Sequence, residues 1–161
     1  LADYSLLGTI FRENTGLLDA NFMTSMETHF LLAEAAERGF ISADTQTLYN
    51  TGVTQAFAYW QVELPENYLT EDAPFDNGNI IENIITQKWI AMFPEGQEAW
   101  SEWRRLDAPA LTPSEFAGDP RIPVRLAYDS SVEDNNQANY ATIVGIQGAD
   151  DLHTKLWWDK N

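Results

Sequence analysis

The sequence predicts an all-α protein in which tetratricopeptide-like helical hairpins are wrapped by long irregular loops. Apolar residues recur at helical spacing over residues 24–63 and again over residues 79–105, and a turn or a proline interrupts each stretch. Two helices joined by so short a break fold back on one another, so each stretch predicts a hairpin. Four prolines within residues 108–135 then exclude a long helix there and indicate an extended wrap.

The composition of the 161-residue chain limits the classes of function. The formal net charge is −16, from 25 acidic and 9 basic residues, which opposes binding to nucleic acid or to anionic lipid surfaces. The absence of cysteine excludes disulfides, thiolate metal sites and cysteine nucleophiles. No apolar run reaches the roughly 18 residues that span a bilayer. Six Trp, six Tyr and eight Phe are many for this length, but aromatic side chains are more often core than ligand platforms.

The first predicted helix lies between residues 24 and 39. Thr24 and Glu27 have the spacing of a capping box, and Gly39 supplies a C-terminal stop. Glu34 and Arg38 stand four residues apart on a narrow polar strip, which favours an ion pair along the helix. Because the rest of its surface is apolar, we expect this helix to be buried against more than one neighbour.

The second predicted helix is capped by Asp44 and runs to about Glu63. Gly52 stands beside aromatic residues and permits close approach of the neighbouring helix, as in tetratricopeptide-like pairs. Residues 24–63 therefore predict one antiparallel hairpin. The apolar stripe of its second helix consists of Tyr49, Val53, Ala56, Phe57 and Trp60.

Residues 79–105 predict the second hairpin. Asn79, followed three places later by Glu82, has the arrangement of an N-cap. A broad apolar arc follows at helical spacing, and Pro94 ends the helix. The next helix, over residues 95–105, carries Trp100 and Trp103 on one face.

Lys88 falls in the middle of the apolar arc of the second hairpin. A buried cation there needs a partner or a route to solvent. One interpretation is a catalytic lysine. The favoured interpretation is an ion pair with Glu98 or Glu102 of the following helix, because such a pair needs nothing else from the sequence.

Residues 106–161 are expected to form the wrap and a C-terminal tail. Arg121 and Arg125 could hold an acidic ligand, but the favoured interpretation is that they pair with nearby Asp and Glu and anchor the wrap to the helix end. One short helix is predicted over residues 136–144. The tail is expected to be ordered, because leaving the adjacent Trp157 and Trp158 both in water would be costly.

The first 22 residues show no sustained period. Their apolar side chains predict either a short helix or an extended packing arm. These side chains belong to Tyr4, Leu6, Leu7, Ile10 and Phe11.

Four stretches of the chain carry motifs that occur together in one protein family. The stretches are residues 23–39 with Leu-Leu-Ala-Glu-Ala-Ala, residues 87–105 with Gln-Lys-Trp-Ile-Ala-Met-Phe and Glu-Ala-Trp-Ser-Glu-Trp-Arg-Arg, residues 122–128 with Ile-Pro-Val-Arg-Leu-Ala-Tyr followed by Asn136 and Asn139, and residues 154–159 with Thr-Lys-Leu-Trp-Trp-Asp. In this order they resemble SusD/RagB proteins, the nutrient-binding outer-membrane lipoproteins of Bacteroidetes. Each motif alone is weak, but four in register over nearly the whole chain carry the resemblance.

The resemblance implies a fold and a function. Residues 1–161 would be the C-terminal part of a longer SusD-like domain, built on a scaffold of helix pairs. The whole protein would lie on the extracellular face of the cell outer membrane, held by a lipid attached upstream of Leu1. It would bind a glycan or another nutrient and deliver it to a SusC-like TonB-dependent transporter. The resemblance implies no enzymatic activity, and no pattern in the sequence indicates a cofactor or a metal site.

No ligand contact can be carried over from the matched motifs, so the predicted contacts rest on aromatic residues in irregular segments. Tyr68 and Phe75 lie in the loop over residues 64–78, and Tyr128 lies in the wrap. Aromatic faces in loops are suited to stacking on sugar rings, and we therefore predict these three as ligand-binding residues. The alternative for Tyr68 and Phe75 is that they fold back onto the helices.

Two other classes of function stay open on the sequence. A glycoside hydrolase built from helical hairpins would need two carboxylates flanking one cleft. Its candidates, which also have ready roles as caps or ion-pair partners, are Glu27, Glu34, Glu98 and Glu102. A structural helical-repeat module that binds protein would differ from a nutrient-binding protein mainly in its partner.

Overall fold

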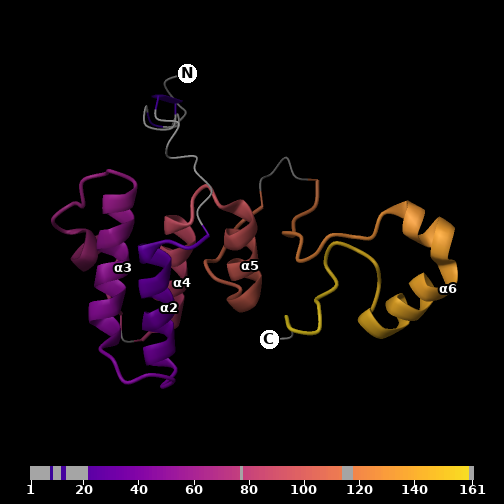
Figure 1. Cartoon of the computed structure of the whole chain (residues 1–161), viewed down its shortest axis with the longest axis horizontal. Coiled ribbons are helices and arrows are strands. Elements are labelled where there is room, and N and C mark those ends of the chain that lie inside the picture. The colour runs from indigo at the N-terminus through magenta and orange to yellow at the C-terminus, as the bar shows by residue number, and fades with distance from the viewer. Residues whose placement is uncertain (1–7, 9–11, 14–21, 77, 114–117, 160–161) are drawn as a thin grey trace.

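The computed structural model describes residues 8, 12–13, 22–76, 78–113 and 118–159, and its regular elements in these ranges are helices. Figure 1 shows α2, α3 and α4 side by side with α5 next to them, and α6 at the opposite end of the molecule. The predicted all-α class is confirmed, whereas the short helix or extended packing arm expected over residues 1–22 falls almost wholly outside the described residues. The elements are α2 (Ser25–Glu37), α3 (Thr45–Tyr59), the short π-helix η2 (Tyr68–Asp72), α4 (Ile80–Ala91), α5 (Gly96–Leu106) and α6 (Ser130–Gln147).

The ends of α2 follow the predicted signals. The Thr24 hydroxyl accepts a hydrogen bond from the Glu27 backbone N–H at 3.3 Å. At the other end Gly39 adopts a φ of +73°, a left-handed conformation that glycine reaches without steric cost. The backbone N–H groups of Gly39 and Phe40 turn back to carbonyls of the last helical turn, as in a Schellman motif. Cap and stop are therefore both confirmed.

Helix α3 begins as predicted but ends earlier. Asp44 Oδ1 accepts a hydrogen bond from the Thr47 backbone N–H at 2.7 Å. The helix then stops at Tyr59, not near Glu63, because Gln61 adopts a φ of +54° and closes the last turn in the manner of a C-terminal glycine. A non-glycine residue in this conformation is uncommon, so the sequence carried no stop signal here.

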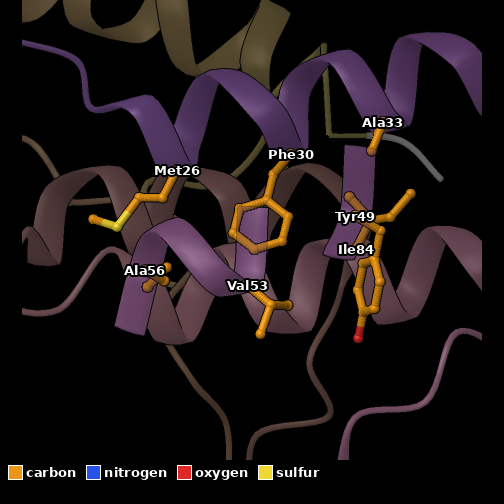
Figure 2. Packing of buried hydrophobic residues seen from close by; sticks show 8 residues of the cluster. Met26, Phe30, Ala33, Tyr49, Val53, Ala56 and Ile84 are labelled. Atoms are coloured by element: carbon orange, nitrogen blue, oxygen red, sulfur yellow. The ribbon is translucent and has the colours of Figure 1, made fainter. Parts of the chain in front are cut away.

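The hydrophobic core lies between α2, α3 and α4, as Figure 2 shows for part of the cluster. Phe30 of α2 is fully buried, and its ring lies edge-on to that of Tyr49, with the centroids 6.3 Å apart. The Tyr49 hydroxyl donates to the Ala73 carbonyl oxygen at 2.9 Å, which ties the following loop to the core. The cluster consists of Met26, Phe30, Ala33, Tyr49, Val53, Ala56, Ile84 and Ala91.

The second hairpin breaks where the sequence indicates, but one predicted cap is wrong. Helix α4 ends at Ala91 and α5 begins at Gly96, so Pro94 lies in the break. Asn79 precedes α4 but makes no side-chain capping bond. Its Nδ2 donates to Asp76 Oδ2 at 3.2 Å instead, so the amide stabilises the preceding turn.

Arg121 and Arg125 of the wrap pair with carboxylates as predicted, but the contacts that anchor the wrap to α5 come from Trp100 and Arg104. Trp100 Nε1 donates to the Pro123 carbonyl oxygen at 2.8 Å, and Arg104 Nη1 donates to the Val124 carbonyl oxygen at 3.1 Å. Arg125 is buried and pairs with Asp150, with Nη2 2.9 Å from Oδ1. Backbone bonds from residues 124 and 125 to the carbonyl oxygen of residue 152 hold the tail beside the wrap. The more exposed Arg121 pairs with Asp119.

The last helix is longer than the predicted 136–144 segment. It begins at Ser130 because Asp129 Oδ1 accepts from the Ser131 backbone N–H at 2.9 Å and caps it. Asn136 has non-helical φ and ψ of −148° and 44° and kinks the helix at the residue where the short helix was expected to start. The helix ends at Gln147, before Gly148 with its φ of +96°.

The two adjacent tryptophans of the tail have different environments: one contacts α5 and the other faces solvent. The Trp158 ring lies 5.0 Å from the guanidinium carbon of Arg104, which also lies 3.8 Å over the Trp100 ring. Trp157 is 80% exposed, whereas Trp158 is 39% exposed. Asp159 behind them is buried and pairs with Lys155 at 3.2 Å. Contacts of one tryptophan therefore dock the tail on α5.

Replacing Gly52 by alanine is expected to lower the free energy of unfolding by roughly 1–3 kcal/mol, the usual cost of overpacking a core. A Cβ at Gly52 would lie 2.9 Å from the ring of Phe30, which is fully buried in the core, so the ring or the helices would have to shift. Urea unfolding at pH 7 measures the change. The matched control is Gly145→Ala in α6, where a Cβ meets nothing within 4 Å and should be neutral or slightly stabilising. Equal losses at the two positions would contradict close packing of α2 on α3.

Candidate functional site

Tyr68 folds back onto the helices from η2. Its ring lies edge-on to that of Phe57, with the centroids 4.9 Å apart, and its hydroxyl donates to Gln87 Oε1 at 3.0 Å. Tyr68 is half-buried. These contacts match the alternative interpretation of Tyr68 as a packing residue, and its role as a ligand contact stays a prediction.

The same tyrosine lines an apolar groove between α3, η2 and α4, which we call the α3–α4 groove. Its volume is about 370 Å³. The indole N–H of Trp60 donates to the Ala91 carbonyl oxygen at 3.1 Å, so the polar atoms of Trp60 and Tyr68 are already engaged within the protein. The groove is lined by Gly8, Val53, Ala56, Phe57, Trp60, Val62, Tyr68, Gln87, Ile90, Ala91 and Phe93.

Phe75 also packs on the helical core. Its ring is tilted on that of Tyr49, with the centroids 5.6 Å apart, and it is half-buried. Because Tyr49 is bonded to the backbone of the same loop, the loop and its aromatic residue are fixed together on α3. The ligand role predicted for Phe75 is not tested by these contacts.

Tyr128 lies in a different part of the molecule, just before α6. Its ring meets that of Tyr140 edge-on at 6.2 Å, and the guanidinium carbon of Arg125 lies 5.4 Å from its centre. Its backbone N–H donates to Asp150, and its hydroxyl donates to Gln147 Oε1 at 3.3 Å. Tyr128 is 41% exposed, so its orientation is fixed while part of its surface faces solvent.

The structure does not bring the three predicted ligand residues into one site. Tyr68 and Phe75 contact side chains of α3, whereas Tyr128 contacts Arg125 of the wrap, Tyr140 and Gln147 of α6, and Asp150 of the following segment. Figure 1 shows α3 and α6 at opposite ends of the molecule. A single ligand pocket formed by all three is therefore excluded within this chain.

A buried ion pair joins the two helices of the second hairpin. Lys88 of α4 and Glu102 of α5 are 4% and 8% exposed, and Lys88 Nζ lies 3.2 Å from Glu102 Oε2. The favoured interpretation of Lys88 is thus confirmed, with Glu102 and not Glu98 as its partner. The ammonium group has no cleft to act in, because it is enclosed with its counter-ion.

The ion pair continues through Arg105 to the first hairpin. Arg105 donates to Glu102 Oε1 at 2.6 Å and to both carboxylate oxygens of Glu34 on α2. Glu34 also accepts from Arg38 at 2.8 Å, the predicted pair along α2. Glu34 is buried, whereas the Arg105 side chain is 38% exposed. We call this connected set of charges the inter-hairpin ion network.

The network pairs two of the four candidate hydrolase carboxylates, Glu34 and Glu102, with cations. Burial alone would raise the pKa of Glu34, but hydrogen bonds from Arg105 and Arg38 outweigh burial and hold its pKa below its usual value. A glycosidase acid needs the opposite shift. Of the other candidates, Glu98 is exposed on α5, and Glu27 donates its backbone N–H, not its carboxylate, to the Thr24 cap.

Among the described residues, no group of three or more His, Asp or Glu side chains could hold a metal ion. Within the same ranges no helix has both the length and the apolar character needed to cross a membrane.

The α3–α4 groove was not predicted from the sequence. Its lining includes Ile90 and Phe93, apolar residues near the end of α4 that are both about half exposed in the structure.

The fold defines an all-helical protein of tetratricopeptide-like hairpins whose wrap and tail are tied to α5. A model of the SusD-like family, described as starch-binding and associating with the outer membrane, matches residues 2–129. The chain belongs to this family. No curated protein matches the chain.

Solved structures of SusD-like proteins are similar to the chain. A Bacteroidetes SusD-like protein is 29% identical with a TM-score of 0.73, and the match covers 86% of this chain and 30% of that one. A SusD homologue from Parabacteroides distasonis is 32% identical with a TM-score of 0.69, covering 88% and 33%. The structure named BT1043 is 28% identical with a TM-score of 0.75, covering 88% and 36%. The chain therefore spans about a third of the length of these solved relatives.

Substituting glutamine for Glu34 is expected to cost roughly 2 kcal/mol of unfolding free energy at pH 7, the value of a hydrogen bond to a charged group. Because the folded-state pKa of Glu34 is lowered, its contribution is fully present above its unfolded pKa of about 4.5 and is lost as pH falls through the folded value. The difference between Glu34→Gln and the unmodified chain should therefore shrink below about pH 4.5.

Urea unfolding between pH 7 and pH 3 measures this dependence. The exposed Glu63, replaced by glutamine, is the control and should change stability by less than about 0.5 kcal/mol throughout. A cost for Glu34→Gln that stays constant as the pH falls would show that the charge of Glu34 does not stabilise the fold.

Proposed function

We propose that this chain is the C-terminal part of a cell-surface protein that binds a glycan or another nutrient and delivers it to a SusC-like TonB-dependent transporter. The observation that carries the proposal is the match of residues 2–129 to a family described as starch-binding and associating with the outer membrane. The proposal includes the extracellular face of that membrane and a lipid anchor upstream of Leu1. The acidic charge of −16 supports an uncharged ligand over a polyanion.

The proposed role is binding without catalysis. Two of the four candidate carboxylates, Glu34 and Glu102, are held by cations in the inter-hairpin ion network. Lys88 is enclosed with Glu102 and is not presented to a substrate. These contacts favour a structural role for the groups that a hydrolase would need, and they support the binding function over the alternative of a glycoside hydrolase.

Among the predicted ligand contacts, Tyr128 has the arrangement that best suits a sugar platform. A ring used for stacking needs an open face and a fixed orientation. Tyr140, Gln147 and the Asp150 bond to its backbone fix Tyr128, while 41% of the residue is exposed. Tyr68 and Phe75 are more enclosed, and we propose them as contacts only where a ligand reaches the loop over residues 64–78.

Tyr128→Ala is expected to weaken glycan affinity about tenfold, equivalent to roughly 1.4 kcal/mol, because it removes the stacking surface. A glycan array on the full-length protein identifies the ligand, and calorimetric titration compares the variants. Phe40→Ala is the control, since Phe40 is an aromatic residue 77% exposed beside α2. Unchanged affinity for Tyr128→Ala would remove this residue from the site, whereas a parent protein that binds no glycan or other nutrient would overturn the function.

Transport delivery and the lack of catalysis are tested on the full-length protein. Affinity capture from detergent-solubilised outer membranes is expected to recover a TonB-dependent transporter, and incubation with polysaccharides is expected to release no reducing ends. Recovery of other proteins without a transporter would favour the structural, protein-binding alternative. Release of reducing ends would favour the hydrolase.

A further inference from the structure

One carboxylate joins three segments of the chain beside Tyr128. Asp150 follows α6, and its Oδ1 accepts from Arg125 Nη2 at 2.9 Å and from the Tyr128 backbone N–H at 3.1 Å. Its Oδ2 accepts from the hydroxyl of Tyr140, a residue of α6, at 3.1 Å. The wrap, the helix and the segment after the helix therefore meet at the side chain of Asp150.

The carboxylate of Asp150 is enclosed by its donors. Its side chain is 9% exposed, and that of Arg125 is 5% exposed. Hydrogen bonds to an ionised group are stronger than bonds between neutral groups, and more so where water is excluded. A ligand on the surface does not reach this carboxylate, so any effect of Asp150 on binding must pass through a residue that it holds.

The neighbours of the Tyr128 ring are themselves held by Asp150. Tyr140 lies edge-on to the ring at 6.2 Å between centroids, and its hydroxyl is bonded to Asp150. The guanidinium carbon of Arg125 lies 5.4 Å from the centre of the ring, and this group pairs with the same carboxylate. The bond from the Tyr128 hydroxyl to Gln147 Oε1, at 3.3 Å, does not involve Asp150. Backbone, ring edge and ring face of Tyr128 thus all depend on one side chain.

We propose that Asp150 is the positioning residue of a ligand platform formed by Tyr128, and that it acts on the ligand only through that tyrosine. This inference rests on the proposed function, because it takes Tyr128 as a ligand contact. A ring that is ordered before the ligand arrives avoids the entropy cost of ordering it on binding. Without the Asp150 charge, Arg125 is left buried without its counter-ion, and the segment that carries Tyr128 is released.

A double-mutant cycle in ligand affinity tests whether Asp150 acts through Tyr128. Calorimetric titration of the full-length protein with its glycan compares Asp150→Asn and Tyr128→Ala, singly and together. Asp150→Asn is expected to weaken binding about fivefold, and the double variant should bind no more weakly than Tyr128→Ala alone. Unchanged affinity for Asp150→Asn, or an equal further loss in the Tyr128→Ala background, would overturn the positioning role.

The matched control is Asp119→Asn. Asp119 is another carboxylate of the wrap, and it pairs with Arg121 and His153. Its replacement removes buried and exposed ion-pair partners of a different set, so the affinity is expected to change by less than about twofold. A loss at Asp119 equal to that at Asp150 would show a general effect of loosening the wrap and would overturn the specific role of Asp150.

A spectroscopic readout of Tyr128 works without any ligand. Fluorine NMR of protein labelled with 3-fluorotyrosine reports the surroundings of each ring, and Tyr128→Phe assigns the signal of Tyr128. The signal is expected to move toward that of free fluorotyrosine in Asp150→Asn and to stay in place in Asp119→Asn. Circular dichroism checks that the helices are retained. If Asp150→Asn does not fold, Tyr140→Phe removes one bond to the carboxylate, keeps its charge, and should move the signal in the same direction.

The two readouts separate failure of this inference from failure of the proposed function. A Tyr128 signal that stays in place when the bonds to Asp150 are removed would overturn the positioning role, even where the protein binds its glycan. A parent protein that binds no glycan or other nutrient would overturn the proposed function, and with it the ligand role of Asp150, whatever the signal of Tyr128 shows.

Discussion

The inter-hairpin ion network is the constraint on which the arrangement of the helices depends. Glu34 on α2 and Glu102 on α5 share the guanidinium of Arg105, and Lys88 on α4 closes the set. Removing one partner from such a set leaves a buried charge without compensation, which usually costs more than the pair contributes relative to apolar residues. The network therefore acts chiefly by specifying which helices meet, while the apolar cluster around Phe30 supplies most of the favourable free energy.

The position of the proposed ligand contact follows from this arrangement. Once α5 is fixed against α2 and α4, Trp100 and Arg104 on its other side hold the backbone of residues 123 and 124. The wrap then continues to Arg125, whose pairing with Asp150 joins it to the segment after α6. Tyr128 is thus oriented at the end of a series of contacts that begins in the helical core. Its exposed ring is presented by a fixed segment, although it lies outside the helical hairpins.

Local signals in the sequence were sufficient to predict a contact where the two interacting residues are close along the chain. The cap at Thr24 followed from spacing on one helix, and the pairing of Lys88 with a carboxylate of the next helix was expected, although the sequence left Glu98 and Glu102 open. The end of α3 did not follow from spacing, because Gln61 adopts a conformation that its residue type does not indicate. The Asn79 cap was wrong because the side chain bonds back to Asp76 in the preceding turn and makes no capping bond to α4. Of the candidate site, only the aromatic residues were predictable, since the α3–α4 groove is assembled from three elements and from Gly8.

The most direct test of the ion network is a double-mutant cycle between Glu34 and Arg105, with Glu34→Gln and Arg105→Gln measured singly and together by urea unfolding at pH 7. Charged groups in direct contact within one network give interaction energies of roughly 0.5–3 kcal/mol in such cycles. We predict a stabilising interaction of at least about 1 kcal/mol, since both oxygens of Glu34 accept from this guanidinium. Additive losses within about 0.3 kcal/mol would contradict the claim that this contact specifies how the two hairpins meet.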